Sequence, residues 1–195
     1  MRQRYLWMMM MLTGALLVQG CSTFQLTHEP FTPKGKRLAV IAGLTNPSSL
    51  EAAQAFADEL GKASQFQVIS QKQVAQAIPH YPQLIKGPYK SAYFEIDIDY
   101  TKTDLDRVTQ LHKSLQTDYL YVLWAPSVTT NGQKSWFTKD YSIMQVIAQL
   151  YEFPGSREVG HGSYRVRIDP DKNEIVRDDL QHVTKELAEK THMLK

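Results

Sequence analysis

Cysteine is almost absent from this sequence. Cys21 is the only one among 195 residues, so the chain cannot form an internal disulfide. In an exported protein, a lone cysteine is a free thiol, an intermolecular bridge or a site of modification. Cys21 stands where the apolar run "YLWMMMMLTGALLV" at residues 5–18 stops. Its role therefore has to be inferred together with the segment that precedes it.

The chain after residue 20 also lacks any surplus of charge. The formal charge of +2 arises from 22 basic against 20 acidic residues, and the two extra cations are Arg2 and Arg4. A domain with balanced charge has no overall positive field to attract phosphate backbones or anionic lipid. We therefore expect no nucleic-acid partner.

The first 20 residues have the pattern of an export signal. Arg2 and Arg4 form a short basic region, and the apolar run after them is shorter than the ~20 residues that span a bilayer. The alternative is an uncleaved anchor in which the cysteine is incidental and buried. The sequence favours a signal peptide over residues 1–20.

The stretch "LLVQGCS" around Cys21 resembles the bacterial lipobox, although Gln19 stands where Ala, Ser or Thr is usual. The resemblance implies that the lipoprotein signal peptidase cuts before Cys21, which then carries fatty-acyl chains such as palmitate. Multiple acylation anchors a protein stably to a membrane that it does not span. Ser22, rather than Asp, implies sorting to the outer membrane with the domain facing the periplasm.

One domain is expected after a short linker. Residues 21–36 contain two prolines and one glycine and show neither helical nor strand periodicity, which is typical of a flexible tether. Residues 37–195 then have the length of a single ordinary domain.

The hydrophobic pattern of this domain predicts an α/β fold. The run "RLAVIAGL" at residues 37–44 is typical of a strand buried on both faces. Further strands are expected at residues 66–70, 118–126, 141–153 and 157–168, and helices after Ser48, Ser70, Thr103 and Asp178. The first two strands need a crossover and should be parallel, whereas the last three are joined by turns and should be antiparallel. We expect a mixed sheet with packed helices, close to a three-layer arrangement.

Three stretches resemble the TolB amino-terminal, CsgG and LpoB families. "LAVIAGLTNPSSLEAAQAFADELGKASQFQVIS" is similar to their first β-α-β unit, "LDRVTQLHKSLQTDYLYVLWAPSV" to their helix and strand, and "VIAQLYEFPGSREVGHGSY" to their hairpin. Trp124 stands near the glycine that is usual in these families. The resemblance implies a TolB amino-terminal-like fold and a binding role in the envelope. It does not extend to the long extra hairpins of CsgG pores.

Recognisable catalytic motifs are missing from the sequence. The six histidines form no H-E-x-x-H pair, and "GHGSY" at residues 160–164 is not a G-x-S-x-G elbow. The amides of "GLTNPSS" at residues 43–49 would suit an anion, but the stretch lacks G-x-G-x-x-G and is better explained by helix capping. We expect no enzymatic activity and no cofactor.

An acidic alternation gives a weak candidate for a metal site. Glu95, Asp97 and Asp99 alternate with apolar residues and would share one face of a strand. Such a face can hold a divalent cation, but more often it is a solvated face or a charged edge that discourages strand addition.

Two adjacent aromatic residues are the candidate partner-binding residues. Trp136 and Phe137 follow the turn signal Asn131-Gly132 and are flanked by lysines. Adjacent side chains of a strand point to opposite faces, so at most one of the pair can enter a single core. An exposed tryptophan is a frequent interface anchor. The alternative is a hairpin whose aromatics cover the domain's own sheet.

The leading functional hypothesis is a lipid-anchored accessory protein of the cell envelope. By analogy with the families named above, its partner would be a protein of peptidoglycan synthesis or outer-membrane assembly. One alternative is a small-ligand or metal-binding lipoprotein, and another is a hydrolase with dispersed catalytic residues. A pocket with converging polar groups would favour these alternatives, whereas a flat aromatic patch would favour the accessory protein.

Overall fold

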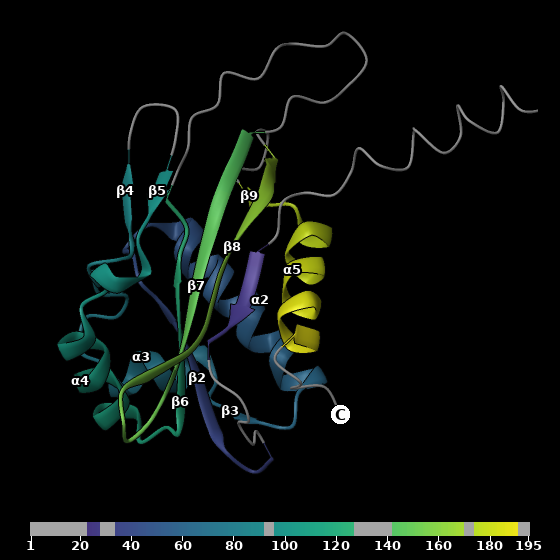
Figure 1. The fold of residues 1–195 in the computed structure, drawn as a ribbon. Helices are drawn as coiled ribbons and strands as arrows, with labels where there is room; N and C mark the ends of the chain where they lie inside the picture. The colour runs from purple at the N-terminus through teal and green to yellow at the C-terminus, as the bar shows by residue number, and fades with distance from the viewer. Residues whose placement is uncertain (1–22, 28–33, 92–95, 127–141, 170–173, 191–195) are drawn as a thin grey trace, which may run out of the picture.

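The computed structural model describes residues 23–27, 34–91, 96–126, 142–169 and 174–190 (Figure 1). The strands are β1 Thr23–Leu26, β2 Arg37–Ala42, β3 Gln67–Val68, β4 Tyr89–Ser91, β5 Ile96–Ile98, β6 Tyr119–Trp124, β7 Ser142–Glu152, β8 Arg157–Asp169 and β9 Glu174–Ile175. The helices are α2 Pro47–Ala63, α3 Gln71–Ala77, α4 Leu105–Leu115 and α5 Arg177–Lys190, and η1 Tyr100–Lys102 is a short 3-10 turn.

The described strands form one mixed sheet and one small hairpin. The large sheet has seven strands in the order β1-β8-β7-β6-β2-β3, with β9 also paired to β8, and β4 and β5 form a separate antiparallel pair. β2 is parallel to both of its neighbours, β3 and β6. β7 is antiparallel to both of its neighbours, β6 and β8, and its connection to β8 is short. The predicted mixed α/β sheet is confirmed.

The sheet lies between two layers of helices because its central strands are apolar on both faces. In β2, Leu38 and Val40 belong to the core that contains Phe56 of α2 and Leu180 of α5. Ile41, on the opposite face, belongs to a second core formed with residues of α3 and α4. Figure 1 shows α2 and α5 on one side of the sheet and α3 and α4 on the other. The three-layer expectation is therefore confirmed.

Helix α2 starts two residues earlier than the sequence predicts. Its N-cap is Asn46, whose side-chain oxygen accepts from the Ser49 amide at 2.8 Å, and Pro47 occupies the first turn. Proline suits that turn because its φ is already helical and it has no amide hydrogen to leave unpaired. Asn46, rather than the expected Ser48, therefore caps the helix.

Helices α3 and α4 also begin at residues whose side chains cap the first turn. The predicted box at α3 is confirmed, with Ser70 and Gln73 bonded reciprocally. At α4 the cap is Asp104, which accepts from the Arg107 amide at 3.0 Å, and not the expected Thr103. The Thr103 hydroxyl instead donates to the side chain of Gln149 in β7, so it serves a long-range contact that a local pattern cannot reveal.

Part of the expected tether is a strand. Residues 23–26 form β1, which pairs antiparallel with residues 160–163 of β8 at the edge of the sheet. The pairing satisfies backbone groups of β8 that β7, on the other side, cannot reach. The expectation that residues 21–36 contain no strand is wrong for these four residues, because a run this short carries too little periodicity to be recognised.

Candidate functional site

An open groove of about 600 Å³ lies beside the β4–β5 hairpin. Its lining comes from the segment before and within β4 and from the segment that runs from β5 through η1: Leu84, Ile85, Lys86, Gly87, Pro88, Tyr89, Lys90, Asp97, Asp99 and Lys102. The volume falls within the roughly 300–1,000 Å³ of typical small-ligand sites. Among the described residues, this groove is the best candidate for a binding site.

The groove adjoins the carboxyl ends of β2 and β6. The Ile85 amide donates to the carbonyl of Gly43, directly after β2, at 3.0 Å. From β2 the chain passes through α2 to β3 on one side, and it then returns through α3 and α4 on the opposite face to reach β6 on the other side of β2. Such a reversal is the place where open α/β sheets bind ligands.

Trp124 fixes the groove lining to the sheet. Its side chain is fully buried, and its indole N–H donates to the carbonyl of Ile85 at 3.0 Å. A Cβ added to Gly43 would lie 2.4 Å from Trp124 Nε1, and one added to Gly87 would lie 2.7 Å from it. The indole is therefore enclosed by two glycines whose missing side chains make room for it.

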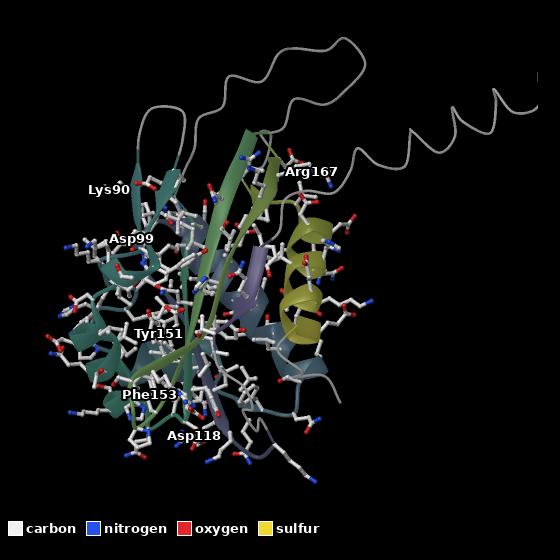
Figure 2. All side chains as sticks on the ribbon, viewed as in Figure 1. Lys90, Asp99, Asp118, Tyr151, Phe153 and Arg167 are labelled. Atoms are coloured by element: carbon white, nitrogen blue, oxygen red, sulfur yellow. The ribbon has the colours of Figure 1, made fainter. Side chains whose placement is uncertain are left out.

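Charges of both signs line the groove. Its lysines are Lys86, Lys90 and Lys102, and its carboxylates are those of Asp97 and Asp99. Lys90 and Asp97 face each other across the β4–β5 ladder. Figure 2 shows Lys90 and Asp99 on the same side of the molecule, near the hairpin. With three cations against two anions, the lining has a small positive excess.

Asp99 is already satisfied by neighbours in its own turn. Its carboxylate accepts from the hydroxyl of Thr101 at 2.6 Å and from the Thr101 amide at 3.1 Å. The Lys102 ammonium lies 3.9 Å away. The Thr101 hydroxyl, its amide and Lys102 together lower the pKa of Asp99 below its usual value. Asp99 is thus an ionised cap of η1.

Lys86 and Lys90 are differently placed, since neither forms an ion pair with a residue in the described parts of the chain. Beside them stands Leu84, whose side chain is 68% exposed. Tyr89 is half-buried, and this burial raises the pKa of its phenol. The groove therefore combines two available cations with an apolar wall.

A polar network holds η1 against the sheet. The ring of Tyr100 stacks on His161 of β8, with centroids 3.8 Å apart. The Tyr100 carbonyl accepts from Gln149 of β7 at 3.0 Å, and the Gln149 amide also donates to Glu158 at 2.6 Å. Burial raises the pKa of Tyr100 to about 12, so its ring stays neutral. These contacts fix the positions of Asp99 and Lys102 on the groove rim.

The structure brings together two of the residues that the sequence singled out. Asp97 is exposed on β5 between the half-buried Ile96 and Ile98, so the predicted alternation is present there. Asp99 follows β5 and lines the same groove. In the described residues, no group of three or more His, Cys, Asp or Glu is placed to hold a metal ion. Glu95, Cys21, Trp136 and Phe137 lie outside the described residues.

The groove lysines were not identified from the sequence. Lys86 and Lys90 lie on either side of Gly87-Pro88, in and after a stretch that three prolines mark as a loop. The only available signal was the motif "LIKGPYK" itself, in which two lysines flank Gly-Pro next to apolar residues. The described part of the chain also contains no helix long and apolar enough to cross a membrane.

Comparison with known proteins identifies the fold. No protein-family model and no curated protein sequence matches this chain. Its structure is similar to the PelC dodecamer from Paraburkholderia phytofirmans, with a TM-score of 0.53 and 10% identity over 89% of this chain and 99% of that one. A PelC variant gives a TM-score of 0.51 at 10% identity over the same shares. Lipoprotein GNA1162 from Neisseria meningitidis gives 0.48 at 13% identity, over 80% of this chain and 98% of that one. The chain thus has the fold of PelC.

Proposed function

We propose that this protein is a lipid-anchored envelope lipoprotein whose periplasmic domain works by binding a partner and not by catalysis. The observation that carries the proposal is the groove, which combines the exposed Leu84 with Lys86 and Lys90, neither of which has an ion-pair partner in the described part of the chain. Its described lining contains no serine, cysteine or histidine that would act as a nucleophile or general base. A lining of this kind favours recognition over bond cleavage.

The membrane attachment is proposed at Cys21. The support is the lipobox-like "LLVQGCS" after a basic and then apolar leader, together with the absence of any second cysteine. Ser22 supports sorting to the outer membrane, with the domain in the periplasm. The partner is proposed to be a protein of peptidoglycan synthesis or outer-membrane assembly, and its support is the resemblance to the TolB, CsgG and LpoB families.

Labelling with a radioactive fatty acid in living cells tests the anchor. Cys21→Ser should abolish incorporation of label and leave the precursor uncleaved, because the acylated thiol is gone. Ser22→Asp is the matched control, which should keep the label while moving the protein from the outer-membrane to the inner-membrane fraction. Labelling of Cys21→Ser at the wild-type level would contradict the proposal.

Site-specific crosslinking in cells tests the partner. A photoreactive residue at Lys90, inside the groove, should capture one defined envelope protein, and the same residue at Lys113, exposed on α4, should not. Equal capture at both positions would indicate random collision and argue against a binding groove.

Trp136 and Phe137, which lie outside the described residues, are a second candidate to test. If Trp136 anchors the partner, Trp136→Ala should abolish capture with little change in thermal stability. A buried tryptophan would instead cost about 3 kcal/mol or more of unfolding free energy. That result would assign Trp136 to the core and remove it from the binding surface.

Self-association is a second candidate function. PelC is described as a dodecamer, and this chain shares its fold over 89% of its length. Native mass spectrometry of the full chain in detergent should then show a closed oligomer. A monomer at every concentration tested would argue against it.

A further inference from the structure

The geometry of the groove points to its occupant: an extended peptide segment of the partner, with an acidic side chain next to an apolar one. This inference rests on the proposed function, since it assumes that the domain binds a protein. The acidic group would bind Lys86 and Lys90, and the apolar group would cover Leu84 and Tyr89. Backbone, charge and exposed apolar surface each support it independently.

The groove lining has one more lysine than aspartate, and a ligand anion can balance this excess positive charge. Asp99 is held by Thr101, whose hydroxyl and amide donate to it, and by Lys102 at 3.9 Å, while its charge also acts on Lys90. Within the described lining, three lysines therefore face two carboxylates, and Asp97 lies opposite Lys90 in the hairpin. A ligand carboxylate that reached the exposed ammonium groups of Lys86 and Lys90 would form charge-assisted hydrogen bonds with them.

The apolar residues of the groove favour a ligand that has an apolar side chain next to that carboxylate. Leu84 is 68% exposed, and a single exposed leucine has no significance by itself. Here it stands in a recess together with Pro88 and the half-buried ring of Tyr89, directly beside the lysines. A side chain that covered Leu84 would remove apolar surface from water while its acidic neighbour reached Lys86.

The hairpin offers a backbone for an extended chain. β4 and β5 have three residues each and, within the described residues, pair only with one another. Each strand therefore has one edge without a strand partner among these residues, and such an edge is a common docking site for an extended peptide. The recess is also preformed, because the Asp99 amide donates to the Pro88 carbonyl at 2.6 Å and the Asp104 amide to the Lys86 carbonyl at 3.1 Å. A preformed site loses less entropy on binding.

A membrane surface fits the groove less well than a peptide does. Two carboxylates, Asp97 and Asp99, lie within the lining and would repel a sheet of anionic headgroups. A peptide can place its single acidic group beside the lysines and keep its other residues away from the aspartates. Charges of both signs within one lining therefore suit a discrete, extended ligand.

A displayed library of random nonapeptides, selected on the full-length protein in detergent micelles, tests the inference. The peptides enriched by the wild type should combine Asp or Glu with a neighbouring Leu, Ile or aromatic residue. The enrichment should be lost in a K86E/K90E variant and retained in a K72E/K113E variant, which reverses two exposed lysines on α3 and α4 outside the groove. An enriched set that K86E/K90E leaves unchanged would overturn the inference.

One enriched peptide, labelled with fluorescein, then gives the affinity by anisotropy. We expect K86E/K90E, or exchange of the acidic residue of the peptide for lysine, to weaken binding about tenfold or more. The single variants Lys86→Gln and Lys90→Gln, confirmed to melt as the wild type does, provide the same test if the double variant is unstable. Equal affinity for acidic and lysine-containing peptides would overturn the inference.

Vesicles containing phosphatidylglycerol provide the competing probe. If vesicle binding depends on Lys86 and Lys90 and peptide binding does not, the occupant is a lipid surface and the inference is wrong. The proposed function is judged separately, by capture in cells. Capture of a partner through residues outside the groove, with peptide selection indifferent to K86E/K90E, would leave the proposed function standing and remove only this inference.

Discussion

Trp124 donates its indole N–H to the carbonyl oxygen of Ile85, 3.0 Å away, and so joins the end of β6 to the segment that lines the groove. Both residues are almost completely buried. The bond spans two parts of the chain that no local pattern connects. The position of the groove therefore depends on the packing of one side chain in the core of the sheet.

Trp124→Phe should destabilise the domain by about 1–3 kcal/mol, because it leaves a buried carbonyl without its donor and removes part of a large ring. Denaturant unfolding of the full chain measures this. Leu84→Ala, in the same lining but exposed, is the control and should change stability by no more than about 0.5 kcal/mol. An equally small effect for Trp124→Phe would show that the bond does not hold the segment.

Gly87→Ala should be destabilising because the new methyl group would lie 2.7 Å from Trp124 Nε1 and 2.8 Å from Tyr89 Cε1. The indole is buried and cannot move aside without disturbing the core, so a loss of about 1–3 kcal/mol is expected. Gly155→Ala is the matched control, since nothing lies within 4 Å of its added Cβ. Thermal melting should separate the two variants; identical melting temperatures would contradict the close packing.

Gly61→Ala should instead stabilise the protein. Gly61 lies within α2, and the nearest atom to an added Cβ is 4.0 Å away, on Val68. Alanine is favoured over glycine in a helix interior by about 1 kcal/mol. The melting temperature should rise accordingly, and a decrease would show that the helix is packed more tightly at this position than the structure indicates.

Asn46→Ala should cost about 1–2 kcal/mol, because Asn46 caps α2 and its side-chain amide also donates to the Ala125 carbonyl at 3.2 Å. Ser48→Ala is the informative comparison, since the sequence pattern placed the cap there and the structure does not. The change at Ser48 should be close to zero by chemical denaturation. A larger loss at Ser48 than at Asn46 would favour the cap expected from sequence.

The pair Arg167–Asp179 should make stability depend on acid. Burial alone would raise the pKa of Asp179, but the hydrogen bonds and charge of Arg167, whose Nε lies 2.9 Å from Oδ2, outweigh it and lower that pKa. A carboxyl group with a lowered pKa contributes stability above its unfolded pKa of about 3.9 and loses it as pH falls through the folded value. The contribution is about 1 kcal/mol once solvent screening is included.

Asp179→Asn should therefore reduce stability near pH 7 and leave a smaller further loss on acidification than the wild type shows. Unfolding curves at several pH values between 7 and 3 measure both effects. Asp58→Asn, on the exposed face of α2, is the control. A wild type and an Asp179→Asn variant with parallel pH profiles would contradict the assigned role.

The fold was largely predictable because its main elements are long and apolar. The run at residues 37–44 identified a central strand, and connection lengths distinguished the parallel from the antiparallel pairs. β1, β4 and β9 were missed because two to four residues carry no recognisable period. The alternation around Asp97 predicted an exposed acidic face, and Asp97 is exposed and lines the groove, but the groove itself was not predicted. Lys86 and Lys90 were missed, since only the tertiary fold brings that proline-marked loop to the same place.

The position of β1 determines how a force at the proposed lipid anchor would reach the domain. β1 begins at Thr23, so the two residues from Cys21 span no more than about 7 Å. Lipid at Cys21 would therefore hold the edge of the sheet close to the bilayer. The domain would not move at the end of a free tether of sixteen residues. A pull directed along β1 would load its ladder with β8 in shear, with the backbone hydrogen bonds of four residue pairs sharing the force. Strain applied at the membrane would then reach the sheet directly, through its longest strand.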